Sequence, residues 1–183
     1  MALSPDASAI QIKVEDLSQL FNTLDPFPFR ERDLDKEAEE FIVGWARELP
    51  KDAPVKIVIH VADGKAPALN SEDLGQALRR YFSYRADISS RELRELFRVG
   101  RLSLTIGIAV LVVCFSMASA LTKFTSQGQL LGIFEEGLLI LGWVANWKPI
   151  EIFLYDWWPI AQRRGLYNRL AQATVDVRAD NSP

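Results

Sequence analysis

The stretch LSLTIGIAVLVVCFSMASALT, residues 102–122, decides the fold of this chain because it contains no charged side chain. Its oxygen-bearing side chains are hydroxyls, which can hydrogen-bond back to the backbone of their own helix. As a helix that rises about 1.5 Å per residue, it spans roughly 30 Å, the thickness of the hydrocarbon core of a bilayer. The sequence therefore predicts a membrane-spanning helix here, in preference to a buried helix of a soluble protein.

A second apolar stretch follows a short turn predicted at residues 123–129, and it can be placed in a bilayer in two registers. One register spans residues 130–148. The other spans residues 137–156 and puts Lys148 and Glu151 near the bilayer centre, where a charge costs on the order of 3 kcal/mol. The first register is therefore favoured, and in it Lys148 extends its ammonium group to the inner interface.

Two adjacent acids, Glu135 and Glu136, are the sharpest signal in this second stretch. Adjacent residues on a helix point about 100° apart, so they cannot both face one partner helix. A carboxylate within hydrocarbon must pair, bind a proton or face water. The favoured interpretation places both at the outer interface, at the positive end of the helix dipole. A contact between helices and a path for protons or cations stay open as alternatives.

Other polar and small residues in this region indicate contacts between helices. Asn146 can hydrogen-bond to a second helix or lie at the interface as a harmless amide. Lys148 and Glu151 can pair on one helix face, although an extended lysine beside an interfacial acid is favoured. Small residues also recur four or five apart, which can permit close helix approach: Ser103 and Gly107, Ser116 and Ala120, and Gly132, Gly137 and Gly142.

Basic and aromatic residues set the expected orientation. Five arginines lie between residues 85 and 101 and four basic residues between 148 and 169, whereas only Lys123 lies between the two stretches. By the positive-inside rule, both termini are cytoplasmic. The arginines of RELRELFRVGR, residues 91–101, can also contact anionic lipid headgroups. An aromatic belt is expected near one leaflet from Trp143, Trp147, Tyr155, Trp157 and Trp158.

The charged N-terminal half predicts a small α/β domain. IQIKV, residues 10–14, alternates apolar and polar side chains, as a half-buried strand does. VKIVIHVAD, residues 55–63, is rich in β-branched residues and predicts a second strand. Residues 35–49 lie between the two and predict a helix, with Asp35 as its cap. Two strands in this arrangement should be parallel.

Further helices are expected to begin at Ser71 and, through a capping box, at Ser89. The apolar stripes of the helix at residues 35–49 and of the helix that begins at Ser71 supply candidate residues for the core of the domain or for an interface with a partner: Phe41, Trp45, Tyr81 and Phe82.

The expected fold is α+β with a membrane part, in three sections. Residues 1–99 form a small βαβα cytoplasmic domain, residues 100–160 form a two-helix transmembrane hairpin with an interfacial segment, and residues 161–183 form a cytoplasmic tail that frays at its end. Because two strands make only a marginal sheet, we expect copies of the chain, a partner or the membrane to complete the domain.

Composition excludes several classes of function. The formal charge of −3 argues against broad binding of nucleic acid, which needs a basic face. Cys114 is the single cysteine and His60 the single histidine, so no metal site is expected. A structural role is favoured for His60. No cofactor and no catalytic residue are assigned.

Two stretches, FRERDLDKEAEEFIVGWARELP and EEGLLILGWVANWKPIEIFLYDWWPI, resemble a family of uncharacterised bacterial proteins with two membrane spans. The resemblance implies a location in the bacterial inner membrane and no particular chemistry.

The sequence thus predicts a non-enzymatic, membrane-anchored assembly or interaction protein, which contacts lipid and either forms a homo-oligomer or binds a membrane protein. The alternative is a small oligomeric channel or transport component that uses Glu135 or Glu136.

Overall fold

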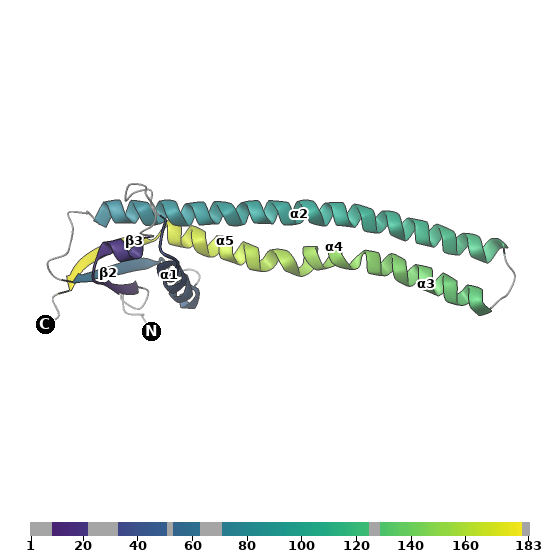
Figure 1. Ribbon diagram of the computed structural model, residues 1–183, viewed down its shortest axis with the longest axis horizontal. Helices are drawn as coiled ribbons and strands as arrows, with labels where there is room; N and C mark the ends of the chain where they lie inside the picture. The colour runs from purple at the N-terminus through teal and green to yellow at the C-terminus, as the bar shows by residue number, and fades with distance from the viewer. Residues whose placement is uncertain (1–8, 22–32, 51–52, 63–70, 125–128, 181–183) are drawn as a thin grey trace. The chain divides into compact units, whose positions relative to one another are not determined.

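The structure is a computed structural model that describes residues 9–21, 33–50, 53–62, 71–124 and 129–180 (Figure 1). It is mostly helical, with one small parallel sheet. The chain divides into two compact units. One combines Met1–Ile88 with Gln162–Pro183, and the other comprises Ser89–Ala161. The first unit therefore contains both ends of the chain.

The sheet of the first unit has three parallel strands in the order β1-β2-β3: β1 (Ala9–Val14), β2 (Lys56–Ala62) and β3 (Thr174–Asp180). Strands were predicted at the positions of β1 and β2, and both are confirmed. Ile12 of β1 pairs with Ile59 of β2, which pairs in turn with Val177 of β3.

The third strand corrects two expectations. The C-terminal segment was expected to fray, and the sheet was expected to need an outside partner, but β3 completes the sheet from within the chain. The backbone N–H of Thr174 donates to the carbonyl of Val55 at 3.1 Å. Val175 is 9% exposed and belongs to the core. The reason is geometric, because alternation places Val175 and Val177 on the same face as the isoleucines of β2.

Helix α1 (Lys36–Glu48) begins as predicted, because the Asp35 carboxylate accepts a hydrogen bond from the N–H of Glu37 at 2.9 Å. Helix α2 (Ser71–Phe124) continues without interruption, so the separate helix expected at Ser89 is wrong. Ser89 is 2% exposed inside α2, where burial on one stripe with Ala86 and Leu93 continues across the supposed boundary.

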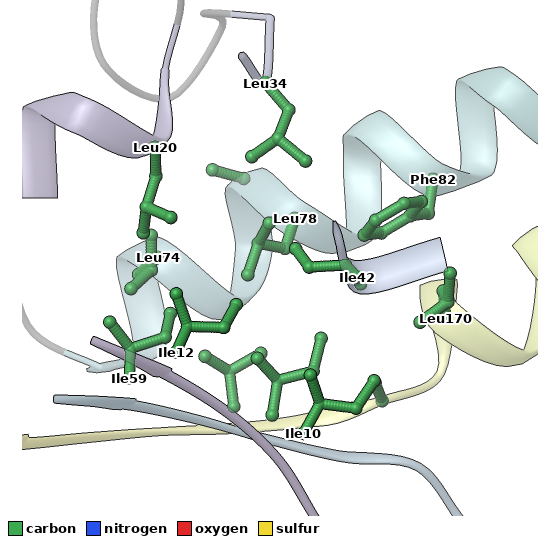
Figure 2. Close-up of a cluster of buried hydrophobic side chains, with 14 of the residues drawn as sticks. Ile10, Ile12, Leu20, Leu34, Ile42, Ile59, Leu74, Leu78, Phe82 and Leu170 are labelled. Atoms are coloured by element: carbon green, nitrogen blue, oxygen red, sulfur yellow. The ribbon is translucent and has the colours of Figure 1, made fainter. Parts of the chain in front are cut away.

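Apolar side chains fill the space between the sheet and the helices of the first unit (Figure 2). Ile10, Ile12 and Ile59 point from the strands toward Leu74 and Leu78 of α2. Ile42 of α1, Phe82 of α2 and Leu170 of α5 (Trp157–Ala171) close the cluster, together with Leu20 of η1 (Leu17–Leu20) and Leu34. All these labelled side chains are at least 92% buried, so this unit has a well-formed core of its own.

In the second unit, a series of shorter helices packs antiparallel to α2: α3 (Gln129–Ala145), α4 (Trp147–Glu151), the π-helix η3 (Ile152–Asp156) and the start of α5. Helix α3 ends at Ala145 because Pro149 has no N–H with which to bond the Ala145 carbonyl. The next helix, α4, starts at Trp147, two residues before the proline.

Two helical segments of the described chain, Glu72–Ala120 and Gly132–Ala171, each contain a stretch long and apolar enough to cross a membrane. In each segment, one continuous apolar stretch of eighteen residues meets this condition, and only 17% and 22% of these stretches are buried. The core helix of a soluble protein would be mostly buried, so these two segments present their apolar side chains outward.

Candidate functional site

A line of buried residues marks the seam between α2 and the helices opposite it in the second unit. Buried residues recur on α2 at intervals of seven: Leu93, Gly100, Gly107 and Cys114. Burial at every seventh residue is typical of a coiled-coil seam. Gly100, Gly107 and Cys114 have small side chains or none, so they permit close approach of the opposite helices.

Asn146 is the polar centre of this seam. It is 7% exposed, and its side-chain amide donates to the carbonyl of Gly107 at 3.0 Å and to that of Gly142 at 2.9 Å. The first bond crosses to α2, and the second returns to α3. Of the two interpretations that the sequence left open for Asn146, the geometry matches the hydrogen bond between helices.

At three glycines of the seam, Gly100, Gly107 and Gly142, an added side chain would force a neighbour to shift, and a Cβ atom on Gly100 would lie 2.9 Å from Ile152. A Cβ atom on Gly107 would lie 2.7 Å from the side-chain oxygen of Asn146 and 3.0 Å from the Ala145 carbonyl oxygen. A Cβ atom on Gly142 would lie 2.7 Å from Leu111. By contrast, Gly132 and Gly137 have open space around them.

The expected small-residue pairs therefore divide. Ser103 is half-buried and Gly107 is buried, so the first pair lies on the seam. The second pair, Ser116 and Ala120, is exposed, and the Ser116 hydroxyl donates to the backbone of Val112. The expectation of close packing at this second pair is wrong within the chain, because it faces away from the seam.

Glu135 and Glu136 lie in different surroundings. Glu135 is seven residues before Gly142 and half-buried, so it shares the side of α3 that faces the seam. Glu136 is exposed, as is Gly137 next to it. The structure therefore separates the two acids.

Lys148 pairs with two acids, of which the sequence anticipated one. Its ammonium group lies 3.1 Å from Glu151 and 3.3 Å from Asp156. Glu151 immediately precedes the π-helix η3, and Asp156 is the last residue of that helix. Both partners follow Lys148 in the chain, so the ammonium group is directed away from α3.

A second polar cluster lies in the first unit and was not predicted. Glu39 of α1 accepts hydrogen bonds from the Tyr81 hydroxyl at 2.8 Å, the Tyr167 hydroxyl at 2.9 Å and the Arg85 guanidinium at 2.8–2.9 Å. Arg85 also lies over the Tyr167 ring, 5.5 Å from its centroid. Because these residues come from α1, α2 and α5, the cluster joins three helices around one carboxylate.

The surroundings of this cluster shift its proton affinities. Burial, followed by the hydrogen bond to Glu39, raises the pKa of the Tyr81 hydroxyl well above its ordinary value. Burial also raises the pKa of Tyr167. The cluster thus keeps both phenols protonated and able to donate. One signal in the sequence could have revealed it, because Glu39 precedes the buried Ile42, Val43 and Ala46 on their own helix face.

The aromatic candidates of the first unit take different positions. Phe82 is fully buried in the core, and Tyr81 is half-buried in the Glu39 cluster. Phe41 and Trp45 are 45% and 51% exposed, with ring centroids 6.1 Å apart on the outer face of α1. This exposed pair is therefore available to a partner.

His60 lies on the face of β2 opposite Ile59 and is half-exposed. Among the residues that the structure describes, no group of three metal-ligating side chains comes together.

No protein-family model, curated protein or solved structure matches this chain. The resemblance to two-span bacterial proteins thus stays an expectation, and function must be argued from the residues themselves.

Proposed function

We propose that this protein is a non-enzymatic membrane anchor for an interaction domain. In this proposal, α2 and the helices from α3 onward form a hairpin across the bacterial inner membrane, and the α/β unit lies in the cytoplasm. One observation carries the proposal: two segments that could each cross a bilayer present their apolar side chains outward. In water, so large an apolar surface would drive association, whereas lipid covers it without cost.

The sheet supports a shared compartment for the two termini. Strands β1 and β3 both pair with β2, so the chain leaves this unit after β2 and returns to it before β3. A chain that leaves and re-enters one compact unit crosses a membrane an even number of times. The positive-inside rule then favours the cytoplasm for that unit.

Contacts along the seam support the register that spans residues 130–148. Leu111 lies against Gly142. Because the two helices are antiparallel, moving seven residues forward on α2 and seven residues back on α3 brings Ala118 level with Glu135. Ala118 is four residues from Thr122, so Glu135 would lie about 6 Å inside the outer edge. At the other end, the pairing of Lys148 with Asp156 draws the ammonium group toward the inner interface.

The proposed work of the cytoplasmic unit is to bind a partner, either another copy of the chain or a membrane protein. Phe41 and Trp45 support this role, because exposed aromatic residues are enriched at protein interfaces. Tethering at the membrane would raise the local concentration of that partner.

Two measurements test the proposal. The full chain should sediment with membranes and require detergent for release. Reporters of cytoplasmic location fused to either terminus should both be active. Recovery of a monodisperse protein in buffer without detergent, or reporters active at one terminus only, would contradict it.

A second candidate, a component of an oligomeric channel, is favoured by one observation: Glu136 is exposed on a helix whose neighbouring side chains are largely apolar. In an oligomer that carboxylate would face a pore. Glu136→Gln should then reduce ion flux in liposomes without altering assembly. If the protein is only an anchor, neither the unchanged chain nor Glu136→Gln should give any ion flux.

A further inference from the structure

An open depression on α2 gathers four arginines immediately before the uncharged stretch: Arg91, Arg94, Arg98 and Arg101. Their spacing of three, four and three residues places them on one stripe of the helix. All four are exposed. The remaining lining residues are Glu95 and Phe97.

The depression is strongly positive. Among the described residues that line it, Glu95 is the one acid. Its carboxylate lies 3.9 Å from the guanidinium of Arg98, whose side chain is 78% exposed. A pair so long and so exposed is weak. Guanidinium groups present two parallel N–H donors, an arrangement that matches the oxygens of a phosphate.

Apolar surface adjoins this charge on two sides. The Phe97 ring, half-buried, stacks on Phe153 with their centroids 6.0 Å apart and gives the depression an apolar wall. Beyond Arg101, the stripe continues through Ile108 and Val112, which are 48% and 58% exposed. Phosphate-binding groups followed by apolar surface match the order of groups in a phospholipid.

We propose that this depression binds the headgroup phosphate of an anionic membrane phospholipid, whose acyl chains lie along the exposed face of α2. The inference rests on the proposed membrane anchoring. It adds a selectivity that anchoring does not require, namely a preference for anionic over zwitterionic lipid. Free phosphate would use the guanidinium groups but not the apolar surface.

The test uses the full chain reconstituted in vesicles of equal phosphatidylglycerol and phosphatidylcholine, extracted with mild detergent and analysed by native mass spectrometry. Phosphatidylglycerol should be the retained lipid. Arg98→Gln and Arg94→Gln should each lower the retained ratio of phosphatidylglycerol to phosphatidylcholine about fivefold. Arg79→Gln is the matched control, an exposed arginine of α2 outside the depression, and should leave the ratio unchanged.

The outcomes separate the two proposals. A protein that stays in the bilayer but retains both lipids equally, or that loses selectivity equally in Arg79→Gln, overturns the lipid site and leaves anchoring intact. Displacement of phosphatidylglycerol by excess inorganic phosphate also overturns it, because the phosphate group alone would then account for binding. A protein that does not partition into the vesicles overturns both.

Discussion

Single residues act in this protein mainly through close approach and through shared hydrogen-bond acceptors. Gly107 permits α2 to lie against Asn146, and Glu39 accepts hydrogen bonds from three side chains. The missing side chain of Gly107 permits two helices to pack closely, and the Glu39 carboxylate links α1 to the helices that carry its donors.

Gly107→Ala should destabilise the helix pair. Its new methyl group would meet the Ala145 carbonyl and the Asn146 side chain, which two hydrogen bonds hold in place. Overpacking of this kind costs about 1–3 kcal/mol. Unfolding of the reconstituted protein by titration with a denaturing detergent measures the effect. Gly137→Ala, at a position with open space, should be neutral, and equal loss in both variants would contradict the seam.

The raised pKa of Tyr81 predicts a dependence of stability on pH. A phenol whose pKa is higher in the folded than in the unfolded chain holds its proton more tightly when folded. It therefore stabilises the fold fully below the unfolded pKa of about 10, and this contribution is lost progressively at higher pH. Melting temperatures measured between pH 8 and pH 11, as a rough range, should fall above about pH 10.

Tyr81→Phe should reduce that fall and should destabilise the protein by about 1 kcal/mol at neutral pH, because Glu39 loses one donor. Tyr84→Phe provides the control, since Tyr84 is 53% exposed on the same helix. A pH profile that is the same in both variants would assign the effect to other groups, among them Tyr167.

Among the elements, β3 has the largest consequence. It adds a strand to a sheet that would otherwise have only two, and its valines join the core formed by α2 and β2. The strand pairs over its full length with β2, so residues 174–180 are part of the fold of the first unit.

Val175→Asp should unfold or strongly destabilise the first unit, by about 3 kcal/mol or more, because it buries an unpaired charge near Gly75. Thr174→Asp, next to it on the opposite and exposed face, should be tolerated. Limited proteolysis of the two variants in membranes should distinguish them. Equal resistance to protease would show that β3 does not support the sheet.

At the scale of the whole molecule, the two units differ in their surfaces: the first has a buried core of its own, whereas the second presents exposed apolar side chains such as Val112 and Phe115. From the proposed hairpin we expect that lipid, and not water, contacts some of the residues that are exposed in the structure. In a Cys114→Ala background, Val112→Cys should resist a membrane-impermeant maleimide although Val112 is 58% exposed in the structure, because lipid would cover it in the proposed hairpin. Glu48→Cys, exposed on α1, should react in inside-out vesicles. Rapid labelling of Val112→Cys in intact vesicles would contradict the proposed hairpin.

Much of the local structure followed from the sequence by itself. The helix cap at Asp35, the strands β1 and β2, and the two apolar stretches all depend on neighbouring residues or on simple periodicity. Backbone geometry and hydropathy act over one helix or strand, so a single chain without comparison is enough to reveal them.

The tertiary structure decided the rest. The pairing of β3 with β2 joins residues more than a hundred positions apart. The hydrogen bonds from Tyr81 and Tyr167 to Glu39 join side chains that are 42 and 128 positions apart. It also decided that Glu135 faces the seam whereas Glu136 does not. Such outcomes depend on which surfaces meet after folding, and local propensity does not encode that choice because every apolar stripe and every strand edge admits several partners.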